Sequence, residues 1–168
     1  MHTKLDTTRP PAPDETWAPD SAALRSRALD LQRSRDKGIP QPLLRGKNIG
    51  LLCESDTDAE AAMLRAAATE LGAKVASIRP SLSDLNTPQD IARTARILGR
   101  LYDALLCQGV APHLVRQLRH DAGVPVLEGI PSWITDPAFA DGMPEPASSE
   151  PPDRCRYLLQ AALLSTLR

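Results

Sequence analysis

Hydroxyl and carboxyl side chains are concentrated in one short segment, directly after an apolar run at residues 49–53. Ser55, Thr57, Asp58 and Glu60 follow that run, and an alanine-rich stretch then continues to Gly72. The apolar run is typical of a buried strand, and the alanine-rich stretch is typical of a helix. Where a strand leads directly into a helix, the free N–H groups at the helix start commonly bind phosphate. Carboxylates at this position would instead repel a phosphate.

The same segment fits a capping box. In that arrangement the Thr57 hydroxyl accepts a hydrogen bond from the N–H of Glu60, and the Glu60 carboxylate accepts one from the N–H of Thr57. The helix dipole would also favour negative charge at Asp58 and Glu60. The simplest interpretation is therefore structural. The alternative is a weak ligand-binding pocket for a neutral or cationic molecule, lined by Ser55, Thr57 and Gln108.

Composition excludes several classes of function. The formal net charge of the 168 residues is −1, so no overall field attracts nucleic acid or an anionic membrane. Aromatic residues make up 3% of the chain, which leaves few platforms for stacking nucleobases. No stretch is typical of a transmembrane span or a signal peptide, and the three cysteines are unevenly spaced. We therefore expect no disulfide framework and a cytoplasmic location, with no nucleic-acid or membrane partner.

Cysteine and arginine side chains offer two further candidate sites, each with a simpler interpretation. Cys53 and Cys107 are expected near the ends of neighbouring strands, where a redox pair or half of a metal site is one hypothesis. Burial as small apolar side chains is the favoured one. The stripe formed by Arg93, Arg96 and Arg100 has helical spacing. We interpret it as a solvated or salt-bridged face, with an anion site as the alternative.

Hydrophobic periodicity predicts four strands that alternate with helices. Such an order indicates an α/β fold, a four-stranded parallel sheet flanked by helices, in a single domain. Thr87 and Pro88 form a cap and first position for one of these helices, and Pro112 begins another. The predicted organisation is a disordered arm at 1–19, the domain at 20–135, a proline-rich loop at 136–153 and an amphipathic helix at 154–168.

Three segments resemble the carbamoyl-phosphate-binding half of ornithine carbamoyltransferases, in the family's order and at its spacing. They are PLLRGKNIGLLCE at 42–54, TARILGRLYDALLCQG at 94–109 and AGVPVLEGI at 122–130. In the ornithine and aspartate carbamoyltransferase family this N-terminal half is a four-stranded parallel sheet with flanking helices. The resemblance therefore implies the same fold that the periodicity predicts.

The residues that bind carbamoyl phosphate in the family do not match. Its Ser-Thr-Arg-Thr-Arg motif falls on residues 57–61, where both arginines are replaced and Asp58 and Glu60 are present. Gln108 stands where the family has the arginine that polarises the carbamoyl group. The family's His-Pro-x-Gln motif falls on residues 135–138, and its Lys-Glu-Ser loop falls on residues 88–90. The resemblance thus implies degenerate active-site motifs, and these 168 residues contain no counterpart of the family's second domain.

We expect a non-catalytic homologue that acts in binding or assembly, with no catalytic residues, no cofactor and no metal. Whether it is an enzyme is left open, with the prediction leaning toward a pseudoenzyme. Two alternatives remain. One is a small-molecule binding protein that uses the crevice expected at the carboxyl ends of the strands. The other is a carbamoyltransferase completed by a separate amino-acid-binding chain. Because the family forms trimers, the resemblance implies a homo-oligomer or a mixed oligomer with an intact relative.

Overall fold

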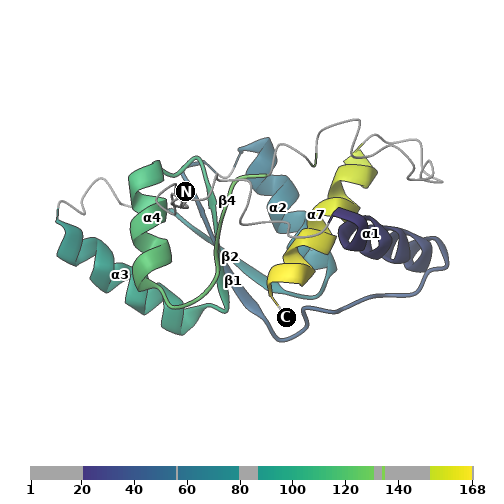
Figure 1. The fold of residues 1–168 in the computed structure, drawn as a ribbon, viewed down its shortest axis with the longest axis horizontal. Coiled ribbons are helices and arrows are strands. Elements are labelled where there is room, and N and C mark those ends of the chain that lie inside the picture. Colours follow the sequence, from purple (N-terminus) through teal and green to yellow (C-terminus); the bar gives the residue numbers. More distant parts are fainter. Residues whose placement is uncertain (1–20, 56, 80–86, 131–133, 135–151, 168) are drawn as a thin grey trace, which may run out of the picture.

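The protein is a three-layer α/β domain in which a parallel sheet separates two groups of helices (Figure 1). The structure, a computed structural model, describes residues 21–55, 57–79, 87–130, 134 and 152–167. The strands are β1 (Asn48–Cys53), β2 (Lys74–Ile78), β3 (Ala104–Gln108) and β4 (Val126–Glu128). The helices are α1 (Ser21–Asp36), α2 (Ala59–Glu70), α3 (Pro88–Leu101), α4 (Pro112–Asp121) and α7 (Pro152–Thr166). The predicted four-stranded parallel sheet with flanking helices is confirmed.

The strand order is β2-β1-β3-β4, and every neighbouring pair is parallel. In the register between the two central strands, Leu52 lies beside Cys107 and Cys53 beside Gln108. From β1 the chain turns through α2 to one side, and from β3 it turns through α4 to the other. The carboxyl ends of β1 and β3 therefore meet at the topological switch point, where sheets of this kind commonly form a crevice.

Each face of the sheet carries its own apolar core. Figure 1 shows α3 and α4 on one side of the strands and α2, α7 and α1 on the other, with α1 outermost. Because side chains alternate along a strand, Cys53 lies in the core beneath α2 and α7, whereas Cys107 lies in the core beneath α3 and α4. Both are buried free thiols on opposite faces. Opposite faces argue against a redox pair and support the simpler interpretation of two buried apolar side chains.

The buried side of α2 agrees only in part with the sequence pattern, which predicts that Ala62, Met63, Ala66, Ala67 and Leu71 face inward. Ala67 and Leu71 are buried and Met63 is partly buried, but Ala62 and Ala66 are exposed. Ala61, Leu64 and Ala68 are buried beside Ala67. The reason is compositional, since an alanine-rich helix has no bulky apolar stripe to reveal which face turns toward the sheet.

The last helix is enclosed on most sides. It begins at Pro152, two residues before the predicted start, and its residues 157–164 are all buried. An amphipathic helix was predicted, but α7 packs against both α1 and α2, so opposite sides of α7 are covered. The sequence could not reveal this because the partner on the second side, α1, is more than a hundred residues away.

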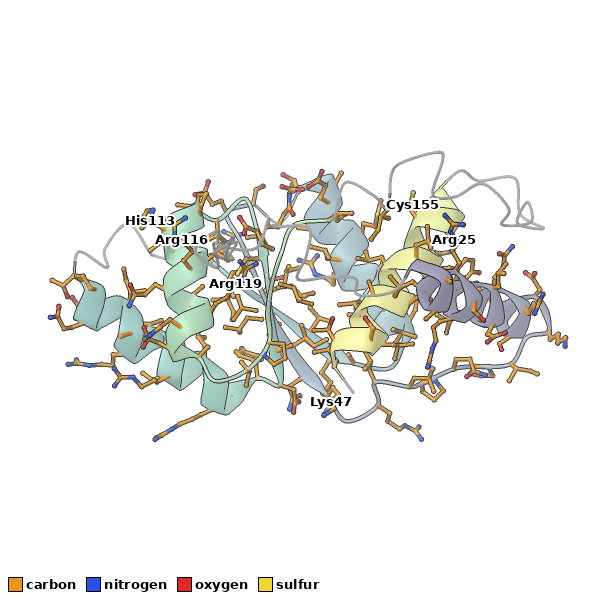
Figure 2. The ribbon with its side chains drawn as sticks, in the orientation of Figure 1. Arg25, Lys47, His113, Arg116, Arg119 and Cys155 are labelled. Atoms are coloured by element: carbon orange, nitrogen blue, oxygen red, sulfur yellow. The ribbon has the colours of Figure 1, made fainter. Side chains whose placement is uncertain are left out.

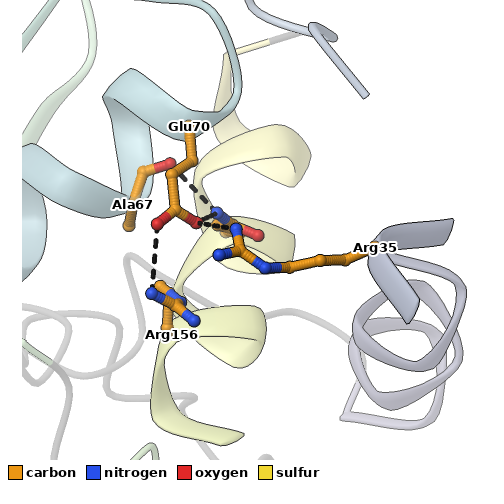
Figure 3. Close-up of polar contacts among 5 residues, drawn as sticks. Arg35, Ala67, Glu70 and Arg156 are labelled. Atoms are coloured by element: carbon orange, nitrogen blue, oxygen red, sulfur yellow. Dashed lines mark hydrogen bonds and ion pairs between the residues drawn. The ribbon is translucent and has the colours of Figure 1, made fainter. Parts of the chain in front are cut away.

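Glu70 on α2 joins the three helices of this layer (Figure 3). Its carboxylate accepts hydrogen bonds from Arg156 Nη1 at 3.1 Å and from Gln160 Nε2 at 3.0 Å, both on α7. Arg35 Nη1 of α1 lies 3.4 Å from Glu70 Oε2. Gln160 Nε2 also lies 3.3 Å from the carbonyl oxygen of Ala67. One carboxylate therefore fixes how α1, α2 and α7 meet.

Several predicted segments lie outside the described residues. These are the arm at 1–19, most of the proline-rich loop at 136–153, and residues 135–138, on which the His-Pro-x-Gln motif falls. Among the helices that the structure describes, none combines the length and the apolar character that crossing a membrane requires.

Candidate functional site

The start of α2 is closed by a carboxylate of the chain itself. Asp58 is the N-cap residue, and its Oδ1 atom accepts hydrogen bonds from the backbone N–H of Glu60 at 2.8 Å and of Ala61 at 3.2 Å. These are two of the free N–H groups that would otherwise be available to an anion. A phosphate at this position would have to displace Asp58 and approach its negative charge.

The predicted capping box is wrong. The N-cap is Asp58, one residue later than predicted, because its short carboxylate reaches the first-turn N–H groups and carries the charge that the dipole favours. Glu60 is then the second helical residue and does not return to the N-cap. The Thr57 hydroxyl bonds instead to Ser55 Oγ at 2.7 Å, and the N–H of Thr57 donates to the same oxygen at 3.2 Å.

Glu60 reaches across to the end of β3. Gln108 Nε2 donates a hydrogen bond to Glu60 Oε2, linking the start of α2 to the carboxyl end of β3. Gln108 Oε1 is buried, and among the described residues it has no hydrogen-bond partner. It faces Gly129, where an added Cβ would lie 3.8 Å from this oxygen. Sequence reasoning missed this pair, since 48 residues separate its members and no local pattern relates them.

The carboxyl end of β4 carries an ion pair. Arg119 of α4 places Nη2 at 3.6 Å from Glu128 Oε2, and its Nε donates to the carbonyl oxygen of Val126 at 3.2 Å. Figure 2 shows Arg119 on the side of α4 that faces β4. Burial raises the pKa of the neighbouring Cys107 thiol to about 12, with Glu128 adding to the effect and Arg119 opposing it. This thiol therefore stays protonated at neutral pH and is not a nucleophile.

The three predicted site residues lie at the same edge of the sheet, but they form two separate contacts. Ser55 and Thr57 bond to each other, whereas Gln108 bonds to Glu60. Neither hydroxyl contacts a general base, so the described geometry provides no activated nucleophile. Within the described ranges, no three His, Cys, Asp or Glu side chains converge closely enough to hold a metal ion. The arrangement consists of acceptor atoms and one amide, which suits neutral or positively charged groups.

Comparison with known proteins shows which fold this chain shares. No protein-family model matches the sequence. The fold is that of a carbamoyltransferase domain. The ornithine carbamoyltransferase of Pyrococcus furiosus superposes with a TM-score of 0.59 at 24% identity, over 79% of this chain and 41% of that structure. The aspartate transcarbamoylase of Trypanosoma cruzi, solved with carbamoyl phosphate and aspartate, gives 0.58 at 24% identity, over 71% and 42%.

Sequence similarity identifies the relatives more specifically. The chain is 39% identical over 103 residues to the catabolic ornithine carbamoyltransferase of Burkholderia mallei. It is 38% identical over 103 residues to the ornithine carbamoyltransferase of Cutibacterium acnes. Each match covers 61% of this chain and 31% of the relative. The chain is thus similar to ornithine carbamoyltransferases and spans about a third of the length of the curated relatives it matches.

Proposed function

We propose that this chain is a non-catalytic carbamoyltransferase homologue that has lost carbamoyl-phosphate binding and acts in binding or assembly. The observation that carries the proposal is the occupied start of α2. Asp58 takes up two of the N–H groups there, and Glu60 extends over the neighbouring strand end to Gln108. The similarity to ornithine carbamoyltransferases supplies the expectation that phosphate would bind at this position, and the local carboxylates oppose it.

The expected loss of carbamoyl-phosphate binding energy follows from the charged contacts that are missing. Hydrogen bonds to charged groups contribute roughly 1.5–3 kcal/mol each. Alanines at 59 and 61, in place of the family's arginines, remove such contacts, and the carboxylates of Asp58 and Glu60 add repulsion toward a phosphate. Gln108 offers an uncharged amide that is already bonded to Glu60. Losing three arginine contacts removes roughly 4.5–9 kcal/mol, which is comparable to the binding energy of a micromolar ligand, about 8 kcal/mol, and the repulsion adds to this loss. Millimolar binding is therefore the relevant limit to test.

Titration calorimetry of the purified chain with carbamoyl phosphate tests the proposal. We expect no heat above dilution at millimolar ligand, and no carbamoyl transfer to ornithine. An intact ornithine carbamoyltransferase measured in parallel is the positive control. A dissociation constant below about 1 mM, which corresponds to −4.1 kcal/mol, would show that the site still binds its family's ligand.

A second function is favoured by the unsatisfied acceptor at Gln108. Its buried Oε1 atom, the Glu60 carboxylate and the Ser55–Thr57 hydroxyl pair would together accept hydrogen bonds from a small cationic or neutral molecule. Thermal unfolding with and without small primary amines measures this. A concentration-dependent rise in the midpoint that Glu60→Gln removes would support the small-molecule function over a purely assembly-based one.

A further inference from the structure

The outward side of α3 combines exposed aliphatic and basic side chains. Ile91, Ala92, Ala95 and Leu98 are buried, so the opposite side of the helix faces solvent. Ile97 and Leu101 on that side are 51% and 60% exposed. They are four residues apart and therefore adjacent on the helix surface. Arg93, Arg96 and Arg100 are also exposed. We refer to Arg93, Arg96, Ile97, Arg100 and Leu101 as the α3 face.

Most of the charge of the α3 face is not balanced within the described structure. None of its three arginines lies within ion-pair distance of a described carboxylate, although the charge of Arg96 helps to lower the pKa of Asp121 on α4. Asp90, the acidic residue of the first turn, already accepts a hydrogen bond from Thr87 Oγ1 at 2.6 Å. On α1 the situation differs, because Arg33 pairs with Asp30 at 3.8 Å and Arg35 pairs with Glu70 at 3.4 Å. Figure 2 shows nitrogen-tipped side chains of α3 that extend away from the rest of the molecule.

The backbone beneath the α3 face is held firmly in place. At Gly99 the helix lies directly against the residue that follows α4, such that an added Cβ would be 1.8 Å from the carbonyl oxygen of Ala122. The helix start is capped by Thr87, which accepts from the N–H of Asp90 at 3.2 Å. A rigid surface loses little conformational entropy when a partner binds. The backbone of the face therefore needs no rearrangement on docking, and only its side chains would have to be ordered.

We propose that the α3 face binds an acidic, aliphatic helix of a partner protein. Ile97 and Leu101 would contact the apolar seam of that helix, and the guanidinium groups beside them would pair with its carboxylates. Charge complementarity selects this occupant: the described face offers cations and aliphatic carbon, so a basic or wholly apolar partner would leave the arginines unpaired on burial. The inference rests on the proposed binding role and specifies its surface.

The test uses a fluorescent three-heptad peptide with Leu at the seam positions and Glu at the flanking ones, titrated with the full chain. We expect saturable binding that weakens by about tenfold, which is 1.4 kcal/mol, in R93E/R100E and in I97S/L101S. The control for R93E/R100E is R33E/K37E, on and beside α1, which makes the same change in charge. The control for I97S/L101S is I39S/L43S, which removes aliphatic side chains of similar exposure. Both controls should bind as the unaltered chain does, and circular dichroism checks the fold of each variant.

Four outcomes would overturn the inference. The first is no saturable binding of the Glu peptide by the unaltered chain. The second is a loss of specificity, seen as equal weakening by the control variants or as equal binding of a Lys-for-Glu peptide. The third is binding to phosphatidylserine-containing vesicles, in place of the peptide, that depends on Arg93 and Arg100. The fourth is self-association abolished by R93E/R100E without peptide binding, which would assign the face to a second copy. None of these bears on the carbamoyl-phosphate titration, so the two proposals fail independently.

Discussion

Asp58 stands immediately before α2, where its Oδ1 atom accepts hydrogen bonds from two backbone N–H groups of the first turn. Glu60 is directed away from those N–H groups and bonds to Gln108 on β3. The two carboxylates therefore have different roles, although they are two residues apart. Asp58 satisfies the helix start, and Glu60 joins α2 to the sheet. Thr57 takes part in neither contact, because its hydroxyl is engaged with Ser55.

These roles predict unequal costs of substitution. Asp58→Ala should lower the free energy of unfolding by about 0.5–2 kcal/mol, because two first-turn N–H groups lose their acceptor. Thr57→Ala should lower the free energy of unfolding by only a few tenths of a kcal/mol, since it removes a bond between two exposed hydroxyls. Urea unfolding followed by circular dichroism measures both. If Thr57→Ala were as costly as Asp58→Ala, the result would favour Thr57 as the N-cap, as the capping-box interpretation predicts.

Helices α3 and α4 pack closely because Gly99 has no side chain. An added Cβ would meet the carbonyl oxygen of Ala122, the C-cap residue that follows α4. On the other face of the sheet, close association depends on charge as well as shape, since Glu70 contacts Arg35, Arg156 and Gln160 from two other helices. The two helical layers are thus held by different means, one by steric fit and one by a shared carboxylate.

Gly99→Ala separates helix propensity from packing. In an exposed helix interior this change would stabilise by about 1 kcal/mol. Here the new Cβ would meet a backbone oxygen at 1.8 Å, so α3 or the chain after α4 must shift. We expect a net loss of about 1–3 kcal/mol in the free energy of unfolding, the usual cost of overpacking. Arg100→Ala at the next, exposed position is the control and should be close to neutral. A stabilised Gly99→Ala variant would contradict the packing described here.

Surface character varies across the molecule. Carboxylates lie at the strand ends, whereas the α3 face is basic and aliphatic. A formal net charge of −1 hides this asymmetry, since it sums over both regions. Assembly with other copies is therefore argued from the similarity to carbamoyltransferases and not from the charge of the α3 face.

We expect the purified chain to form a homo-oligomer, most simply a trimer, or a mixed oligomer with an intact carbamoyltransferase. Closed cyclic symmetry would cover apolar surface without leaving a free patch. Light scattering at tens of micromolar measures the mass, and purification from the native host followed by identification of co-eluting proteins tests the mixed form. An 18.2 kDa monomer with no carbamoyltransferase recovered would contradict this proposal.

Local patterns were sufficient to predict the order of the elements. The four apolar runs became parallel strands, Thr87 and Pro88 began α3, and Pro112 began α4, because caps and hydrophobic periods act over a few residues. The Glu60–Gln108 bond, the separation of Cys53 from Cys107 and the enclosure of α7 by α1 and α2 required the tertiary structure. Each depends on strand register or on packing between segments far apart in the chain. Such contacts leave no periodic signal in the sequence, so the element order could be predicted, while the contacts within the candidate site could not.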